Sequence, residues 1–270
     1  MNYAPGGRSS EPLRGLVPVE VDVLDGRAAA LPGWRSCGFE LVSGSPSAVS
    51  DWTDDEEIAA VHYPEVEALA RSLTGCAHAL VSDHVKRTAE SAKRAREQSP
   101  VRLVHSDFAP GYDTVVRAAY HGARGRGAAT LARSGLTAHE IEGARRIVMM
   151  QFWRNLGAPT MDTPVAFCDA RTVTPAEGRP FLYTCYVAGG RSFDALAIAA
   201  PADGSTRPHD RYVFPDLVAD EVVAFRTYDT ELVASGETYF TPHSAFRDPR
   251  VPDGGPARFS IELRVLCIDL

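Results

Sequence analysis

Residues 257–266 read ARFSIELRVL, and polar and apolar side chains alternate strictly along this segment. Successive side chains of a β-strand point to opposite faces, so the alternation predicts a strand with one polar and one apolar face. The polar face carries Arg258, Ser260, Glu262 and Arg264, and the apolar face carries Phe259, Ile261, Leu263 and Val265. The guanidinium fork of Arg258 and the hydroxyl of Ser260 are together suited to binding a carboxylate.

A second string, HSDF at residues 105–108, places an imidazole and a carboxylate two residues apart. In an extended segment, His105 and Asp107 point to the same face. With one more imidazole, for which we select His243 in the string TPHS, they form the 2-His-1-carboxylate set that holds non-haem Fe(II). This set leaves positions open for O2 and a co-substrate. An HxD pair alone occurs by chance in many chains, so the metal prediction depends on the whole combination with Arg258 and Ser260.

Arg258 needs an anionic partner if it lies inside a barrel, because an unpaired buried charge costs on the order of several kcal/mol. Glu262 lies four residues further along the same face, roughly 13–14 Å away by strand rise, and is too distant. Asp107 is reserved for the metal. The main remaining partner is the carboxylate of a small-molecule co-substrate.

Strand-like segments dominate the chain after residue 100, and helical segments lie mainly before residue 145. The expected strands cover residues 17–24, 38–42, 78–85, 101–108, 147–154, 164–168, 181–187, 194–200, 210–215, 221–229, 237–243 and 258–266. No repeated βα unit is present. Many short strands at regular spacing predict a mainly β protein with flanking helices. We expect a double-stranded β-helix, or jelly roll, with the metal ligands at its open mouth.

Helix signals are clear at two places. Residues 51–73 are expected to be helical with a break at Tyr63-Pro64, and Gly75 ends the second part. Thr137 and Glu140 form a capping box that opens a short helix. Between these places, residues 112–134 are expected to hold one helix and a loop rich in glycine and arginine.

Composition excludes several classes of protein. The chain has 270 residues, 44% hydrophobic and 23% charged, and a net charge of −7 with no basic block, which argues against a nucleic-acid partner. It has no run of 18 apolar residues and no secretory leader, so no membrane association is expected. The five cysteines are scattered without a CxxC pair, which favours a reducing cytoplasm. We expect residues 1–15 to be poorly ordered and residues 16–270 to form a single domain.

The chain resembles a known family through a set of strings in a fixed order. These are YPEVE, SDHVKR, VHSDF, FWRNL, FCDARTV, RYVFPDL, DEVVAFRTYD, HSAFRDP and ARFSIELR. Together they resemble the AsaB-type hydroxylase/desaturase family, which includes proteins related to a cephalosporin methoxylase subunit. The resemblance covers roughly residues 30–268. It implies an Fe(II)- and 2-oxoglutarate-dependent dioxygenase of antibiotic and other secondary metabolism.

Carried over residue by residue, the resemblance places His105, Asp107 and His243 at the family's metal positions. Arg258 and Ser260 match its co-substrate-binding pair. The expected cofactors are therefore Fe(II), 2-oxoglutarate and O2, and the metal ligands are the only residues to which we assign the oxidation.

Further pocket residues are expected on two strands. Trp153 and Arg154 match the family's Trp-Arg string, although Asn155 stands where that string has proline. Gln151 stands where the string has asparagine, and we expect it to contact the co-substrate. Arg154, Trp153 and two residues that follow an earlier strand, His84 and Arg87, are candidates for substrate binding. A surface role is the stronger alternative for His84 and Arg87.

Three functional hypotheses follow. The first is hydroxylation, desaturation or cyclisation of a small molecule, amino-acid-derived or otherwise acidic, in natural-product biosynthesis. The second is an iron oxidase that uses the same triad without 2-oxoglutarate. The third is a non-catalytic partner subunit with the same barrel, against which the intact triad argues. A homodimer is left open.

Overall fold

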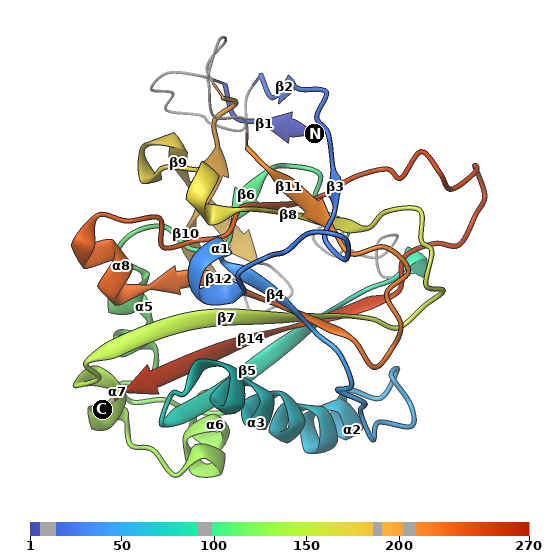
Figure 1. Ribbon diagram of the computed structural model, residues 1–270. Coiled ribbons are helices and arrows are strands. Elements are labelled where there is room, and N and C mark those ends of the chain that lie inside the picture. Colours follow the sequence, from blue (N-terminus) through green and yellow to red (C-terminus); the bar gives the residue numbers. More distant parts are fainter. Residues whose placement is uncertain (6–14, 91–98, 186–190, 202–208, 270) are drawn as a thin grey trace.

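The computed structural model describes residues 1–5, 15–90, 99–185, 191–201 and 209–269, and two β-sheets dominate it (Figure 1). The five-stranded sheet has the order β4 (Phe39–Val42), β12 (Val222–Asp229), β7 (Arg146–Asn155), β14 (Ser260–Asp269) and β5 (His78–Arg87). The seven-stranded sheet has the order β3 (Leu24–Asp25), β11 (Arg211–Val213), β8 (Val165–Cys168), β13 (His243–Ala245), β6 (His105–Ser106), β10 (Arg191–Ile198) and β9 (Gly178–Cys185). This two-sheet architecture with flanking helices is the predicted one.

Helices cover the outer face of the five-stranded sheet (Figure 1). The longest is α3 (Tyr63–Thr74), and α6 (Arg126–Ser134) lies beside it against β5. The other helices are α1 (Trp34–Cys37), α2 (Asp55–Glu57), α5 (Tyr112–Ala119), α7 (Ala138–Glu142) and α8 (Thr230–Ser235), with short 3-10 turns η3 (Ala170–Thr172) and η4 (Pro175–Glu177). None of the described helices is both long and apolar enough to cross a membrane.

The apolar face of β14 packs outward under these helices, as the sequence predicts. Ile261, Leu263 and Val265 are 0% exposed and belong to one cluster with Val66 and Ala70 of α3. Each such side chain contributes about 1.5–3 kcal/mol when buried. The opposite face of β14 is thereby fixed toward the space between the two sheets.

That interior space is filled with aromatic and aliphatic side chains from both sheets. Near β4 the rings of Phe39, Phe167 and Phe225 pack together, with centroid distances of 5.7 Å for Phe39–Phe167 and 5.0 Å for Phe167–Phe225. A second interior cluster includes Leu266 of β14 and Leu196 of β10. The polar residues of the candidate site lie within this packed interior.

The helical run at residues 55–74 is continuous instead of broken at Pro64. Residues Ile58–His62, labelled η1, form a π-helix, and the backbone N–H of Tyr63 donates to the carbonyl of Ile58, five residues earlier. Proline lacks the N–H that an α-helix interior uses, and the wider turn before it accommodates this loss. Gly75 ends α3 with a left-handed conformation, φ 78°, as predicted.

Other boundaries differ from the sequence prediction. Residues 237–242 are not a strand; α8 precedes them, because the Asp229 side chain caps it at Glu231 N–H and Gly236 ends it. Residues 112–134 hold two helices, not one. Residues 17–24 give only β2 (Val17–Pro18) and the start of β3.

The first five residues of the chain pack against the rest of the fold. Asn2–Tyr3 form β1, which pairs with β2, and Tyr3 is 0% exposed. One large aromatic side chain buries enough apolar surface to hold this short terminus in place. Residues 6–14, which belong to the segment expected to be poorly ordered, lie outside the described residues.

Candidate metal centre

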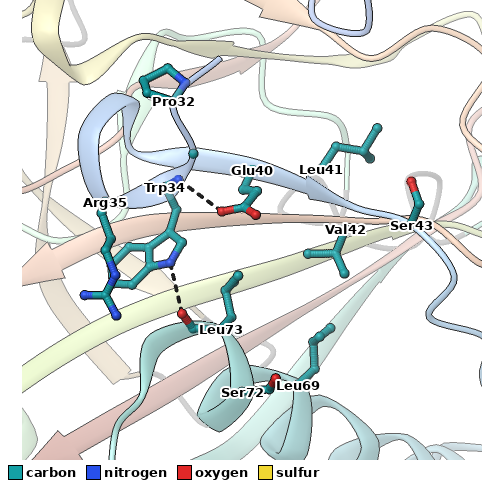
Figure 2. A pocket seen from close by; sticks show the side chains of 11 residues that line it. Pro32, Trp34, Arg35, Glu40, Leu41, Val42, Ser43, Leu69, Ser72 and Leu73 are labelled. Carbon is teal, nitrogen blue, oxygen red and sulfur yellow. Dashed lines mark hydrogen bonds between the residues drawn. The ribbon is translucent and has the colours of Figure 1, made fainter. Parts of the chain in front are cut away.

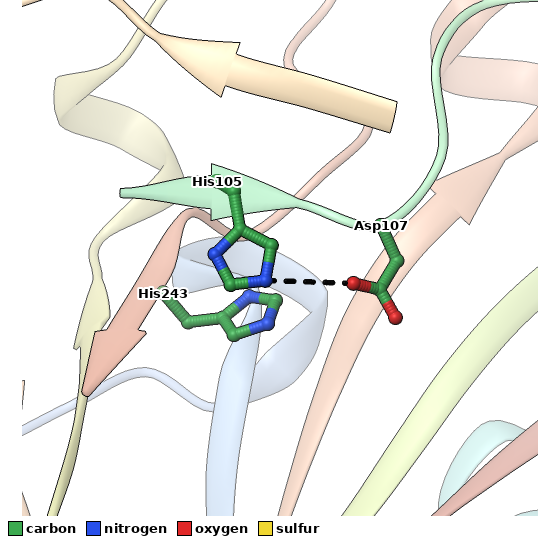
Figure 3. A group of neighbouring side chains, drawn as sticks. All are labelled: His105, Asp107 and His243. Atoms are coloured by element: carbon green, nitrogen blue, oxygen red, sulfur yellow. Dashed lines mark ion pairs between the residues drawn. The ribbon is translucent and has the colours of Figure 1, made fainter. Parts of the chain in front are cut away.

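Strand pairing brings the two histidines together. β13 runs antiparallel to β6, and His243 is the direct cross-strand partner of His105. Their rings lie on the same side of the sheet, with centroids 4.4 Å apart (Figure 3). Asp107 follows β6 immediately and turns toward the same point, with its Oδ1 3.6 Å from His105 Nε2. One ligand atom from each of the three residues, here called the metal triad, lies within 4.8 Å of the others.

Both imidazoles are held in the form that binds a metal. His105 Nδ1 lies 2.8 Å from the carbonyl of Leu103, and His243 Nδ1 lies 3.1 Å from the carbonyl of Thr241. A carbonyl only accepts, so each Nδ1 carries the proton and each Nε2 keeps a free lone pair. Burial lowers the pKa of both rings, that of His105 to about 4, which keeps them neutral at physiological pH.

Asp107 is ionised and firmly held. Burial alone would raise the pKa of its carboxyl group, but the charge of Arg264 and the neighbouring imidazoles bring that pKa well below its usual range. Arg264 reaches Oδ2 with Nε at 2.9 Å and Nη2 at 2.8 Å, and Gln151 donates to the same oxygen at 2.6 Å. The triad therefore offers two neutral nitrogens and one anionic oxygen.

Arg258 lies beside the triad, buried and without an acidic partner. Its side chain is 5% exposed, its Nε donates to Ser260 Oγ at 2.7 Å, and its guanidinium lies 5.1 Å from the ring centroid of Trp153. Among the described residues it forms no ion pair. Burial and the charge of Arg87 lower the pKa of Arg258 to about 9, so it remains a cation at neutral pH.

A small pocket joins these groups, and its wall contains His105, Asp107, Trp153, Arg258, Glu262 and Arg87. The indole N–H of Trp153 is buried and finds no acceptor in the described part of the chain. Arg87 pairs with Ser260 across β5 and β14, which accounts for its inward position, and it donates to the Ser99 carbonyl at 2.9 Å. Cationic and neutral donors thus converge beside the metal triad.

Two expected pocket residues lie elsewhere. Arg154 is the partner of Ile261 and His84 is the partner of Leu263, so both share the outward face of the sheet. Arg154 donates to the carbonyl of Ala219. His84 lies among the helices, with its Nδ1 2.9 Å from Tyr63 Oη and its Nε2 3.2 Å from Asp55. Both side chains therefore lie on the face of the sheet opposite to Trp153 and Ser260, and neither lines the small pocket.

Gln151 and Arg264 both bind Asp107. Gln151 faces inward, and its amide N–H donates to Asp107 Oδ2 at 2.6 Å. Arg264 was recognised only as a member of the polar face of β14. The same alternation that identifies Arg258 identifies Arg264, but its partner Asp107 comes from the other sheet and could not be assigned from sequence.

A second and larger cleft lies on the outside of the molecule, between β4 and α3 (Figure 2). Two hydrogen bonds within the chain hold Trp34 at this cleft. The Trp34 backbone N–H donates to Glu40 at 3.3 Å, and the Trp34 indole donates to the carbonyl of Leu73 at 3.3 Å. No residue of the metal triad or of the small pocket beside it lines this cleft.

Known proteins resemble this chain in sequence and in fold. The curated relatives include the Fe(II)/2-oxoglutarate-dependent dioxygenase nvfI of Aspergillus novofumigatus (strain IBT 16806), 28% identical over 234 residues, covering 85% of this chain and 75% of the relative. The hydroxylase/desaturase poxK of Penicillium oxalicum is 26% identical over 245 residues, covering 85% and 70%. These names bear out the oxygenase class that the sequence predicts.

A solved structure of the iron and alpha-ketoglutarate-dependent endoperoxidase NvfI superposes with a TM-score of 0.69 at 23% identity, covering 99% of this chain and 93% of that one. This likeness confirms the jelly-roll fold. A family model described as "Oxidoreductase/YMDC permease-like domain" matches residues 4–268. The chain therefore belongs to the oxidoreductase/YMDC permease-like domain family, with fungal iron- and 2-oxoglutarate-dependent dioxygenases and hydroxylase/desaturases among its relatives.

Proposed function

We propose that this protein is a non-haem iron(II)- and 2-oxoglutarate-dependent oxygenase that oxidises a small molecule in natural-product biosynthesis. Within its family we place it with the AsaB-type hydroxylases and desaturases. One observation carries the proposal: a buried arginine without an acidic partner, Arg258, lies in the same pocket as a complete 2-His-1-carboxylate triad. The arginine supplies the reason to expect a dicarboxylate, and the triad supplies the reason to expect iron.

The donor set fits ferrous iron. His105 and His243 would bind through Nε2, because each Nδ1 is already bonded to a carbonyl. Asp107 would bind through Oδ1, the oxygen that faces His105. Two imidazoles and one carboxylate on one side of a site are the ligands that non-haem iron oxygenases use, with the other positions left open.

The co-substrate contacts follow from the groups that lack partners. Arg258 and Ser260 would bind the carboxylate of 2-oxoglutarate that is distant from the metal, and the indole N–H of Trp153 would donate a further hydrogen bond. The cation of Arg258 is then compensated by an anion that arrives only with the ligand. None of the described acidic residues forms an ion pair with Arg258, and Glu262, further along β14, instead pairs with Arg264 at 3.8 Å.

When bound, iron and 2-oxoglutarate together supply, with O2, the power to oxidise an unactivated C–H bond. The residues of this chain bind, orient and shield. The ring of Phe225 lies 4.8 Å from that of His243, and the ring of Phe167 lies 6.5 Å away, so water is excluded from that side of the triad. Whether hydroxylation, desaturation or cyclisation follows depends on which substrate hydrogen is held at the open side.

For the substrate we retain Arg87 as the residue that meets an anionic group, since it lines the pocket opposite Ser260. Trp153 would form the adjoining wall. The buried free thiols of Cys37, Cys168 and Cys267 support a reducing, cytoplasmic setting.

Turnover of 2-oxoglutarate provides the test. The purified protein with Fe(II), ascorbate and O2 is expected to convert 2-oxoglutarate to succinate slowly, and faster with a matching substrate. The Asp107→Ala variant serves as the inactive control. If the protein instead consumes O2 and substrate without 2-oxoglutarate, the oxidase hypothesis replaces this one. If it binds neither Fe(II) nor 2-oxoglutarate, the partner-subunit hypothesis is favoured.

A further inference from the structure

Asp107 is bonded in a way that the binding of a metal does not by itself require. Its Oδ2 accepts hydrogen bonds from Arg264 Nε at 2.9 Å and from Gln151 Nε2 at 2.6 Å, and Arg264 Nη2 forms an ion-pair contact with it at 2.8 Å. No donor to its Oδ1 is found among the described residues, and the nearest ligand atom is His105 Nε2 at 3.6 Å. The two oxygens of one carboxylate therefore have very different surroundings.

We propose that Arg264 and Gln151 form a clamp on Oδ2 that restricts Asp107 to a single metal bond through Oδ1. This inference rests on the proposed function. A carboxylate that bound through both oxygens would occupy one of the positions that 2-oxoglutarate and O2 require. The clamp makes Arg264 and Gln151 positioning residues that keep those positions free.

Lone-pair geometry supports the clamp. Each carboxylate oxygen has about two lone pairs, which lie in the plane of the group. The two hydrogen-bond donors, Arg264 Nε and Gln151 Nε2, occupy the two lone pairs of Oδ2, so none remains directed at a metal. Oδ1 keeps both of its lone pairs. Exchange of the two oxygens would break both hydrogen bonds to a charged group and the ion-pair contact with Arg264 Nη2.

The backbone holds the clamp rigidly. Arg264 and Gln151 are direct cross-strand partners on β14 and β7, two neighbouring interior strands of the five-stranded sheet. Gln151 is 0% exposed, and the side chain of Arg264 is 20% exposed. Asp107 follows β6 of the opposite sheet. The clamp thus joins the two sheets at the metal triad, and both donors are anchored on interior strands.

The positive charge of Arg264 distinguishes the clamp from residues that only orient a metal-binding side chain. A cation on Asp107 competes with a metal ion for the same carboxylate. Residues that merely orient a ligand usually increase metal affinity, and their loss weakens binding by about 10–100-fold. Loss of the clamp is expected to increase metal affinity instead, because the freed carboxylate becomes a stronger, bidentate ligand. The second carboxylate oxygen would then occupy one of the metal positions that 2-oxoglutarate and O2 require.

The experiment compares wild type with Arg264→Met, using Mn(II) as a redox-inert probe. Calorimetry measures the Kd of Mn(II) and then the Kd of 2-oxoglutarate for the Mn(II)-loaded protein, and crystal structures of both loaded proteins locate Oδ2. For Arg264→Met we expect Mn(II) binding to be as tight as in wild type or tighter. We expect 2-oxoglutarate binding at least tenfold weaker and Oδ2 within bonding distance of the metal. Arg226→Met, which removes a buried arginine that bonds only backbone carbonyls in the described structure, should change neither constant.

Three results would overturn the inference. One is a 10–100-fold loss of Mn(II) affinity in Arg264→Met with unchanged 2-oxoglutarate affinity. Another is a wild-type structure in which Mn(II) binds both oxygens of Asp107. The third is wild type that binds no Mn(II), which also removes the proposed function. If Arg264→Met does not fold, Gln151→Leu removes one of the two hydrogen-bond donors and leaves the ion pair, and it is expected to shift both constants in the same directions by smaller factors.

Discussion

Replacement of Arg258 with methionine is expected to stabilise the ligand-free protein and at the same time weaken its binding of 2-oxoglutarate. The two effects have one cause, which is a buried cation whose partner is the ligand. Methionine keeps an unbranched chain of similar length in the pocket and removes the charge. An arginine with a purely structural role would show the opposite change in stability.

The magnitude follows from the structure. Burial lowers the pKa of Arg258 from 12.5 to about 9. At 1.36 kcal/mol per pKa unit, this corresponds to about 5 kcal/mol of unfavourable free energy in the ligand-free state. The variant loses the hydrogen bond to Ser260, worth about 1 kcal/mol, and the contact with Trp153, worth about 2 kcal/mol. The net gain is about 2 kcal/mol, or roughly 5 °C in Tm for a chain of this size.

The assay is thermal and urea unfolding of metal-free protein, together with calorimetric binding of 2-oxoglutarate to Mn(II)-loaded protein. The Kd of 2-oxoglutarate is expected to rise about 10–200-fold, the scale of ~1.5–3 kcal/mol of charge-assisted hydrogen bonding. Arg154→Met is the matched control, since Arg154 is also buried but faces away from the pocket. This variant should bind 2-oxoglutarate with the same Kd as wild type. An Arg258→Met protein that is less stable than wild type and binds 2-oxoglutarate normally would refute the reasoning.

Alanine at any one position of the metal triad should abolish stoichiometric binding of Fe(II), measured by metal analysis after anaerobic gel filtration, and retained stoichiometry would remove that residue from the triad. His62 is buried, which lowers its pKa to about 4 despite a hydrogen bond to Glu65. Because the unfolded chain takes up the proton first, the free energy of unfolding should fall as pH drops from 6.5 toward 4. The expected loss is about 2 kcal/mol at pH 5, and urea unfolding of His62→Gln should lack this component. Arg87→Leu should raise the KM of an anionic substrate without changing that of 2-oxoglutarate, whereas His84→Ala should change neither, and steady-state kinetics of succinate formation would separate the two.

The polar face of β14 could be predicted because strand alternation is a local property. The same property gave the common face of His105 and Asp107. The pairing of His243 with His105 could not be derived, because it depends on which distant strands become neighbours in the seven-stranded sheet. It was chosen instead by the need for a third ligand and by family resemblance.

The orientation of Arg154 shows where strand alternation stops being informative. In β7 every residue after Arg146 is buried, so neither face carries a clear polar pattern that marks the interior of the barrel. Alternation correctly separated Arg154 from Trp153, but it could not say which of the two faces inward. Only the register with β14, which pairs Arg154 with Ile261 and Trp153 with Glu262, settles that question.

The register of β14 also connects stability with function. A shift of one residue would move Arg258, Ser260 and Arg264 out of the interior and place apolar side chains there instead. Burial of Ile261, Leu263 and Val265 under α3 contributes about 5–9 kcal/mol in total, at about 1.5–3 kcal/mol each. That is equal to or greater than the roughly 5 kcal/mol by which the unpaired Arg258 disfavours the ligand-free fold. The apolar face of the strand therefore holds in position a polar face that would not be stable there by itself, and 2-oxoglutarate would restore the missing charge.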